Sequence, residues 1–236
     1  MSASTSTALT RTIDAQGVVT LTLDDGDKNA LDPATFDALI AALDDDEARA
    51  FVLAGRAGIL TAGLNVKWMA ANGRDGVQDL LVRFGECLMT WWTEPRPTVC
   101  AATGHAIAAG TMLAMACDHA VAAEGSLWGL TETQIDFEIP DFGLALTRAN
   151  VRADRIEDLL LPGARIDAHA AVEAGYADRV VPAAEVVEAA QVRAGELAAL
   201  PARAYAGTKH RLRGAVAAEV RAGLDADIVA LTAHIG

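Results

Sequence analysis

The sequence predicts an α/β fold with a largely parallel sheet, because short apolar runs of strand character alternate with helix-compatible stretches. Residues 18–23 alternate apolar and polar side chains in a β-rich composition, and the acidic turn 24–27 ends the run. Residues 50–54 and 99–103 are two further apolar runs, each followed by glycine. The helix-compatible stretch 66–92 separates these two runs, and strands connected through helices favour parallel pairing.

Helices in the first half of the chain are predicted from a cap and from apolar spacing. Asp32 followed by Pro33 is typical of an N-cap and a first helical position, and apolar residues then recur at helical spacing as far as Leu43. The pair Asn72-Gly73 is expected to interrupt the long 66–92 helix.

The second half of the chain is predicted to be mostly helical. Residues 119–123 indicate one more short strand, placed after a helix that starts near Gly110. From residue 149 the pattern is helical apart from a β-like interruption at 177–182, and Pro201 begins a last helical stretch.

Composition limits the partners. Apolar residues make up 52% of the 236 residues and charged residues 22%, which indicates a globular core. The net charge of −13 argues against a nucleic-acid partner, although a small anionic ligand remains compatible with locally placed cations. The three cysteines, Cys87, Cys100 and Cys117, lie in apolar runs without metal-ligand spacing, which favours a reducing compartment. No uncharged run reaches about 18 residues, so we expect no membrane span and a cytoplasmic location.

Two segments, 60–67 and 104–111, hold more glycine and alanine than an ordinary core segment. Each follows a predicted strand and opens into a helix, where backbone N–H groups are unpaired and carry the positive end of the helix dipole. Either segment alone fits a tight strand-to-helix turn that needs small residues. Two such turns that converge would form an oxyanion hole.

Four segments together resemble the crotonase (enoyl-CoA hydratase/isomerase) superfamily. They are the small-residue turn at 60–67, the glycine-rich turn and helix at 104–118 that ends in Cys-Asp, residues 128–135, and the Asn-Ala-Leu turn at 28–32. Residues 128–135 look most like Δ3,Δ2-enoyl-CoA isomerases. With residues 201–212, the similarity spans nearly the whole chain.

The resemblance implies a crotonase-type (ClpP/crotonase) α/β fold, a spiral of ββα units with a C-terminal helical section. It implies a flexible N-terminus at 1–10, a core with the acyl-CoA site at 11–189, and a C-terminal helical trimerisation region at 190–236. The expected assembly is a homotrimer or a dimer of trimers. The expected ligand is an acyl-CoA, with coenzyme A as part of the substrate and with neither a separate cofactor nor a metal.

The resemblance also implies the site residues by position. The backbone N–H groups of Leu64 and Ala109 are expected to bind the thioester oxygen. The residues expected to bind substrate or coenzyme A are Lys28, Asn29, Ala30, Ala62, Gly63, Leu64, Asn65, Ala109 and Gly110. Candidate pocket residues are Trp68, Met112, Trp128 and Asp141.

Glu132 is the expected general base, because proton abstraction beside a thioester needs a carboxylate whose pKa is raised by an apolar surround. Hydratases of the superfamily use a second glutamate, and Met112 stands at that position. A thioether moves no proton, so the pair favours a single-base isomerisation of 3-enoyl-CoA to 2-enoyl-CoA.

Three alternatives stay open. A hydratase or a thioester hydrolase would use Glu132 to activate water, helped by Glu138 or Asp141. A homologue that binds acyl-CoA without turning it over would explain the missing second glutamate. Asp136, Glu138 and Asp141 fit a solvated loop as well as an alternative base.

The remaining candidates are weaker. An acyl tunnel or ordinary core packing would account for Trp68, Trp91 and Trp92. Histidines 105 and 119 fit core or strand-end positions better than a catalytic one. Coenzyme phosphates or plain solvent exposure would account for Arg56, Lys67 and Lys209.

Overall fold

The computed structural model describes residues 9–234, which form two sheets, eight α-helices and three short 3-10 helices. The expected flexible segment 1–10 lies outside the described residues except for Leu9 and Thr10. These two residues begin strand β1 (Leu9–Ile13) and pair with Leu23 and Thr22, so regular structure starts before residue 11.

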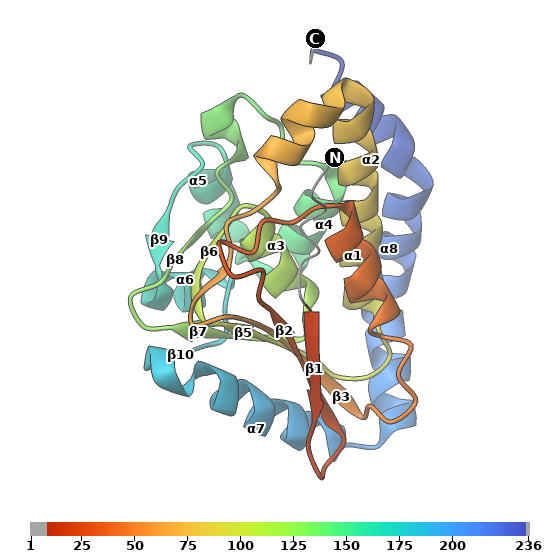
Figure 1. Ribbon diagram of the computed structural model, residues 1–236, viewed down its shortest axis with the longest axis vertical. Helices are drawn as coiled ribbons and strands as arrows, with labels where there is room; N and C mark the ends of the chain where they lie inside the picture. Colours follow the sequence, from red (N-terminus) through yellow and green to blue (C-terminus); the bar gives the residue numbers. More distant parts are fainter. Residues whose placement is uncertain (1–8, 235–236) are drawn as a thin grey trace.

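The larger sheet is mostly parallel, which confirms the prediction (Figure 1). Its strands in order are β1, β2 (Val18–Leu23), β3 (Ala50–Gly55), β5 (Thr98–Ala102), β7 (His119–Ala123) and β10 (Arg179–Val181). The β1–β2 hairpin is antiparallel, and each other neighbouring pair is parallel. The central strand β3 is buried along its whole length, as expected for a parallel strand covered on both faces.

A second, four-stranded sheet consists of β4 (Gly58–Thr61), β6 (Gly104–Ile107), β8 (Leu127–Gly129) and β9 (Ile166–Asp167). Its first three strands directly follow β3, β5 and β7, and α2 (Val66–Thr93) and α3 (Ala109–Ala116) follow β4 and β6. This repeat is the ββα spiral of the crotonase fold, as expected. A Cβ at Gly104 would collide with the carbonyl oxygen of Gly58, so only glycine fits where β6 passes β4.

Two helices of the core prepare the site. Asp32 caps α1 (Pro33–Ala41) by accepting a hydrogen bond from Thr35 N at 2.9 Å, which confirms the predicted cap. The long helix α2 breaks at Gly73, where φ is 61° and ψ is −163°. The predicted interruption at Asn72-Gly73 is therefore confirmed, and α2 consists of two helical parts.

The C-terminal half is helical, with α4 (Asp141–Asn150), α5 (Ile156–Leu160), α6 (Ala168–Ala174), α7 (Val186–Ala198) and α8 (Ala202–Leu231). The short 3-10 helices are η1 (Glu132–Ile135), η2 (Ala153–Arg155) and η3 (Ala183–Glu185). Strand β10 lies inside the predicted interruption at 177–182. Strand β9 is too short for its pattern to be recognised in the sequence.

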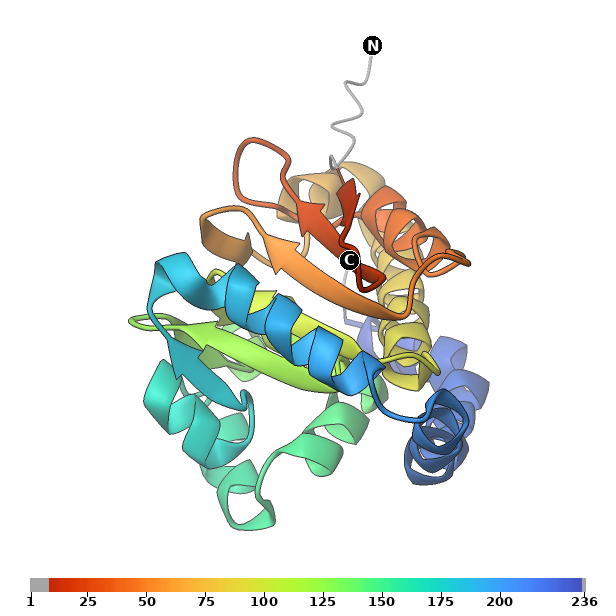
Figure 2. The same cartoon turned by 90° about the horizontal axis from the view of Figure 1, so that it is seen from below.

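Helices α7 and α8 both pack on the body of their own chain. Figure 2 shows α7 lying across one face of the large sheet, where it contacts β2, β3, β5 and β7. Helix α8 runs beside α2 and contacts α4 (Figure 1). The expected domain boundary at residue 190 falls inside α7, because that helix covers the sheet instead of standing apart from it. Trimerisation through residues 190–236 stays a prediction.

No helix within residues 9–234 is long and apolar enough to cross a membrane.

Candidate active site

The turn after β4 leaves one backbone N–H group without a partner. Three of its N–H groups are hydrogen-bonded: Ala62 N to Lys28 O (2.8 Å), Gly63 N to Thr61 Oγ1 (3.0 Å) and Asn65 N to Leu31 O (2.7 Å). Between them, Leu64 N has no hydrogen-bond partner within residues 9–234. The fold therefore leaves the Leu64 N–H available to a ligand.

The second turn presents the start of α3. Ala109 is the first residue of this buried helix, whose N-terminus lacks a side-chain cap. The first N–H groups of a helix have no intrahelical partner and carry partial positive charge. Ala108 before it has a φ of 52°, and its N–H donates to Gly129 O at 2.8 Å, which fixes the turn. The Ala109 N–H is therefore a second donor held in place by the fold.

Leu64 and Ala109 line the same cavity, which has a volume of about 220 Å³. Its wall is otherwise almost wholly apolar and includes Met69, Leu81, Phe84, Met112, Phe137 and Phe142. Glu132 is the one ionisable side chain on this wall among the described residues. The cavity therefore brings together two N–H donors and one carboxylate in an apolar lining. The donors come from the β4–α2 and β6–α3 turns, and the carboxylate comes from the segment after β8.

Burial controls the protonation of Glu132. Its side chain is 7% exposed, and loss of hydration raises its pKa from the ordinary 4.5 to about 7, although the backbone N–H groups of Glu132 and Thr131 act in the opposite direction. Glu132 Oε2 is buried and has no hydrogen-bond partner in the described part of the chain. The surrounding 3-10 helix is fixed by Gln134, whose Nε2 donates to Gly163 O at 2.9 Å. The carboxyl group is thus poised between its two protonation states near neutral pH.

Of the four candidate pocket residues, Met112 lines the cavity and the other three do not. Met112 is 2% exposed and lies on the cavity wall, as expected. Trp128 is outside the wall, because its ring is buried in the core and its Nε1 donates to Ser126 Oγ at 2.9 Å. Trp68 is half-buried against the core and also does not line the cavity. Asp141 begins α4 at an exposed position, and its N–H donates to Asp227 Oδ2 at 2.9 Å.

The alternative carboxylates and the other tryptophans lie away from the cavity wall. Asp136 and Glu138 are exposed, which agrees with the solvated-loop interpretation. Trp91 and Trp92 are 0% and 2% exposed, and both pack in the core. Core packing, and not an acyl tunnel, therefore accounts for these two rings.

The residues expected to bind coenzyme A build the turn beside the cavity. Asn29 is fully buried with a φ of 52°, and its Nδ2 donates to Leu23 O (2.8 Å) and Leu60 O (3.0 Å). This side chain ties the loop after β2 to β4. Lys28 is exposed, and its carbonyl oxygen accepts from Ala62 N.

Four further residues of this set have structural roles as well. Asn65 caps α2 by accepting from Trp68 N at 3.0 Å. Gly63 has a φ of 91°, which favours glycine, and a Cβ at Gly110 would come within 3.2 Å of Thr61 Cγ2. Ala30 donates its N–H to Asp25 Oδ2 at 3.3 Å. Contact between these residues and coenzyme A stays a prediction.

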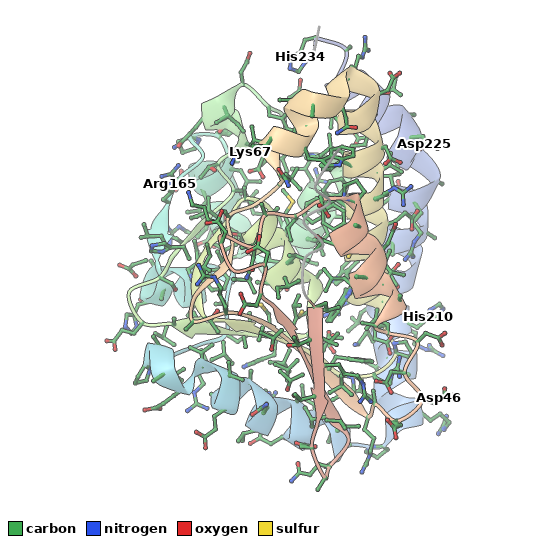
Figure 3. The ribbon with its side chains drawn as sticks, viewed as in Figure 1. Asp46, Lys67, Arg165, His210, Asp225 and His234 are labelled. Atoms are coloured by element: carbon green, nitrogen blue, oxygen red, sulfur yellow. The ribbon has the colours of Figure 1, made fainter. Side chains whose placement is uncertain are left out.

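The weaker cationic candidates differ in accessibility. Lys209 is 5% exposed, and its Nζ donates to Glu94 O (2.7 Å), Arg96 O (2.8 Å) and Asp118. A phosphate role for Lys209 is therefore wrong, because the body of the chain already surrounds its ammonium group. Arg56 donates to Asp27 O, whereas Lys67 is exposed at the start of α2 (Figure 3).

The two histidine candidates lie outside the cavity wall. His105 Nδ1 accepts from Leu127 N at 3.0 Å. His119 begins β7, and its Nδ1 lies 3.5 Å from Asp178 Oδ2. Within residues 9–234, no three His, Cys, Asp or Glu side chains are grouped as metal ligands would be.

One residue within electrostatic reach of Glu132 was not predicted from the sequence. Tyr176 is 1% exposed, and burial together with the charge of Glu132 raises its pKa to about 12. The apolar wall residues Phe84, Phe137 and Phe142 were also not predicted, because spacing along a helix does not show which cavity its face meets.

The ββα spiral, with two free N–H donors and one buried carboxylate on an apolar cavity, defines a crotonase-type protein. The chain belongs to the enoyl-CoA hydratase/isomerase family, whose sequence model, described as "Enoyl-CoA hydratase/isomerase", matches residues 14–235. Acyl-CoA processing is therefore the activity class of the family to which it belongs.

Relatives of the chain carry the names of both reactions. A Thermus thermophilus protein provisionally named an enoyl-CoA hydratase is 35% identical over 179 residues, which are 72% of this chain and 70% of that protein. A structure described as the Mycobacterium tuberculosis enoyl-CoA isomerase has 30% identity and a TM-score of 0.89, covering 95% of this chain and 99% of that one. The human mitochondrial Δ3-Δ2-enoyl-CoA isomerase has a TM-score of 0.89 and 24% identity, covering 95% and 90%, and shows the shared fold alone.

Proposed function

We propose that this protein isomerises 3-enoyl-CoA to 2-enoyl-CoA, with Glu132 as the single acid and base. The observation that supports this most is the cavity wall, where Glu132 is the one ionisable side chain of the described residues and the thioether of Met112 takes the place of a second carboxylate. A 1,3-proton shift needs one group that both accepts and returns a proton, and that is the chemistry one buried carboxylate provides.

The proposed reaction has two steps. Ionised Glu132 takes a proton from C2 of the substrate, and the C2–H electron pair forms a dienolate whose charge rests on the thioester oxygen. The protonated carboxyl then returns the proton to C4, which leaves the double bond between C2 and C3. A carboxyl pKa of about 7 suits both steps, because the ionised and protonated forms are then close in free energy at neutral pH.

The dienolate oxygen would accept hydrogen bonds from Leu64 N and Ala109 N. Both donors are already oriented by the fold and lie in an apolar cavity, so they need no reorganisation as charge develops. In comparable sites, removal of one such donor lowers the rate by about 100- to 1,000-fold. Coenzyme A would lie outside the cavity, along the loop at 28–30 and the turn at 62–65. The proposed chemistry uses no separate cofactor or metal.

Hydration of a 2-enoyl-CoA is the second candidate, because curated relatives such as the Thermus thermophilus protein have hydratase names. Addition of water requires one group to activate the water and another to supply a proton at C2. Met112 cannot take either role, and Asp136, Glu138 and Asp141 do not line the cavity. Glu132 would have to perform both tasks alone, which disfavours hydration.

An assay of the purified protein with matched substrates separates the candidates. We expect conversion of a 3-enoyl-CoA to the 2-enoyl product and little hydration of crotonyl-CoA or release of free thiol. Faster hydration of crotonyl-CoA than isomerisation would overturn the isomerase proposal in favour of a hydratase. Tight acyl-CoA binding in calorimetry without turnover of any of these thioesters would instead indicate a binding protein.

By resemblance to the superfamily, we also propose a homotrimer or a dimer of trimers. Light scattering coupled to size-exclusion chromatography measures the mass directly. We expect three or six copies of the 24.5 kDa chain, and a monomeric mass would contradict the proposal.

A further inference from the structure

Two buried oxygen atoms near the cavity have no hydrogen-bond partner among the described residues. They are Glu132 Oε2 and Tyr176 Oη. Both side chains are almost fully buried, at 7% and 1% exposure. Buried polar atoms are nearly always hydrogen-bonded, so each of these oxygens requires a partner that the described residues do not supply, for which a buried water is suited.

Backbone hydrogen bonds hold Tyr176 in place. It follows Gly175, which ends α6 with a φ of 100°, and Tyr176 N donates to Ala171 O at 2.9 Å. Two residues later, Asp178 N donates to Ala120 O at 2.9 Å, and Ala120 N donates to Asp178 Oδ2 at 2.7 Å. The phenol is therefore attached to a rigid segment.

This segment lies behind the strand that leads to Glu132. Helix α6 contacts β8, and Glu132 follows β8 within the next turn. The charge of Glu132 is one of the two causes of the raised pKa of Tyr176, so the phenol is within electrostatic reach of the carboxylate. Tyr176 does not line the cavity, and it therefore reaches the carboxyl group from the protein side and not from the substrate side.

In the described part of the chain, Glu132 has no ionic partner that would compete with Tyr176. Burial and the backbone N–H groups of Glu132 and Thr131 are the influences on its pKa. Asp136 and Glu138, on the following turn, are exposed. Met112, from α3, and Leu64, from the turn before α2, bring no ionisable group to the cavity. Tyr176, with a pKa of about 12, stays protonated and able to donate near neutral pH.

We propose that Tyr176 Oη donates a hydrogen bond to one buried water, which in turn donates to Glu132 Oε2 and thereby orients the carboxylate. Oε2 is then held by the protein, and the other carboxylate oxygen exchanges the proton with substrate. Tyr176 is a positioning residue in this scheme, because it acts through Glu132 without touching substrate. The inference rests on the proposed role of Glu132 as the base.

The test compares the two tyrosines of the chain. Tyr176→Phe removes the hydroxyl and keeps the ring. Tyr205→Phe is the matched control, because Tyr205 Oη donates to Asp118 Oδ2 at 2.7 Å and Tyr205 lies outside the cavity wall. A hydrogen bond to an ionised carboxylate favours that form, so its loss raises the carboxyl pKa.

We expect Tyr176→Phe to move the acid limb of kcat/KM upward by about one pH unit and to lower kcat about tenfold, with KM changed less than about twofold. Tyr205→Phe should leave the limb in place. A Tyr176→Phe profile that superimposes on the wild-type profile would overturn the inference. Wild-type protein without activity on 3-enoyl-CoA would count against the proposed function instead.

A measurement that does not depend on turnover distinguishes failure of the Tyr176 inference from failure of the proposed function. Carbon-13 NMR of the Glu132 carboxyl carbon, assigned with Glu132→Gln, reports its pKa directly. We expect Tyr176→Phe to raise this pKa by about one unit. If Tyr176→Phe does not fold, 3-fluorotyrosine in the Tyr205→Phe background provides a stronger donor at position 176 and should lower the pKa. An unchanged carboxyl pKa in either experiment would rule out the hydrogen bond.

Discussion

Glu132 and Met112 line the same apolar cavity from two different elements, Glu132 from the 3-10 helix after β8 and Met112 from α3. A carboxyl group is able to exchange protons, and a thioether is not. The proposed choice between isomerisation and hydration depends on this pair, because both reactions would pass through an enolate stabilised by the same two N–H donors.

Replacing Met112 with glutamate should supply the second acid and base. We expect Met112→Glu to hydrate crotonyl-CoA at least about 100-fold faster than Met112→Gln, which has a similar shape but no ionisable proton. The buried carboxyl should also lower the free energy of unfolding by about 2–4 kcal/mol. Hydration rates and urea unfolding of both variants measure these effects. Equal hydration by the two variants would show that position 112 does not decide the reaction.

The rate of isomerisation should depend on the ionisation of Glu132. Because the base must be charged to take the C2 proton, log kcat/KM should rise with pH and level off above an apparent pKa of about 7. A pH series in buffers of constant ionic strength measures this limb. A profile that is flat from about pH 5 to about pH 8 would contradict the assigned role.

The ionisation of Glu132 should also affect the free energy of unfolding. This quantity should fall as pH rises, whereas kcat/KM should rise. The folded protein holds the Glu132 proton up to a pKa of about 7, whereas the unfolded chain releases it near 4.5, so stability falls as pH rises between these values. Above pH 7 the full penalty is about 3 kcal/mol, and below pH 4.5 it is absent.

Glutamine at position 132 has no proton to lose and should escape this penalty. The stability gain of Glu132→Gln over wild type should therefore grow by about 3 kcal/mol between about pH 4.5 and pH 7. Urea unfolding of both proteins across this range measures the difference. A gain that does not change with pH would mean that the pKa of Glu132 is not raised.

The oxyanion donors are testable by backbone substitution. Incorporation of the α-hydroxy analogue of leucine at position 64 replaces the N–H with an ester oxygen and keeps the side chain. We expect kcat/KM to fall by about 100- to 1,000-fold, with the free energy of unfolding changed by less than about 1 kcal/mol, because Leu64 N–H has no partner among the described residues.

The same substitution at Ala62 is the control. Ala62 N–H donates to Lys28 O at 2.8 Å, so its loss should lower stability by about 1 kcal/mol and affect activity less. If the Leu64 ester retains activity within about threefold of wild type, Leu64 N–H does not stabilise the transition state.

The sequence predicted the parts of the site that depend on local pattern. The strands at 18–23, 50–54 and 99–103 and the break at Gly73 have their cause in nearby residues, and the small residues of the turns at Leu64 and Ala109 are visible in the sequence. Glycine, alanine and helix caps act over a few residues, so their spacing is informative.

The failures at the candidate site mostly concern contacts between residues far apart in the chain. Lys209 resembles a surface cation in sequence, but α8 brings it to Asp118 and the carbonyl oxygens after α2. Trp128 is four residues before Glu132, yet its ring is buried in the core. Tyr176 reaches the neighbourhood of Glu132 only because α6 packs against β8. Such contacts depend on the tertiary fold, and no local pattern encodes them.

The rate of 3-enoyl-CoA isomerisation by wild-type protein and by Glu132→Gln at saturating substrate tests the central claim most directly. Glutamine keeps the shape of the side chain and removes its ability to carry the proton. We expect wild-type protein to form the 2-enoyl product and Glu132→Gln to be at least about 1,000-fold slower, with similar affinity for acyl-CoA. Isomerisation by Glu132→Gln within about tenfold of wild type would show that another group moves the proton.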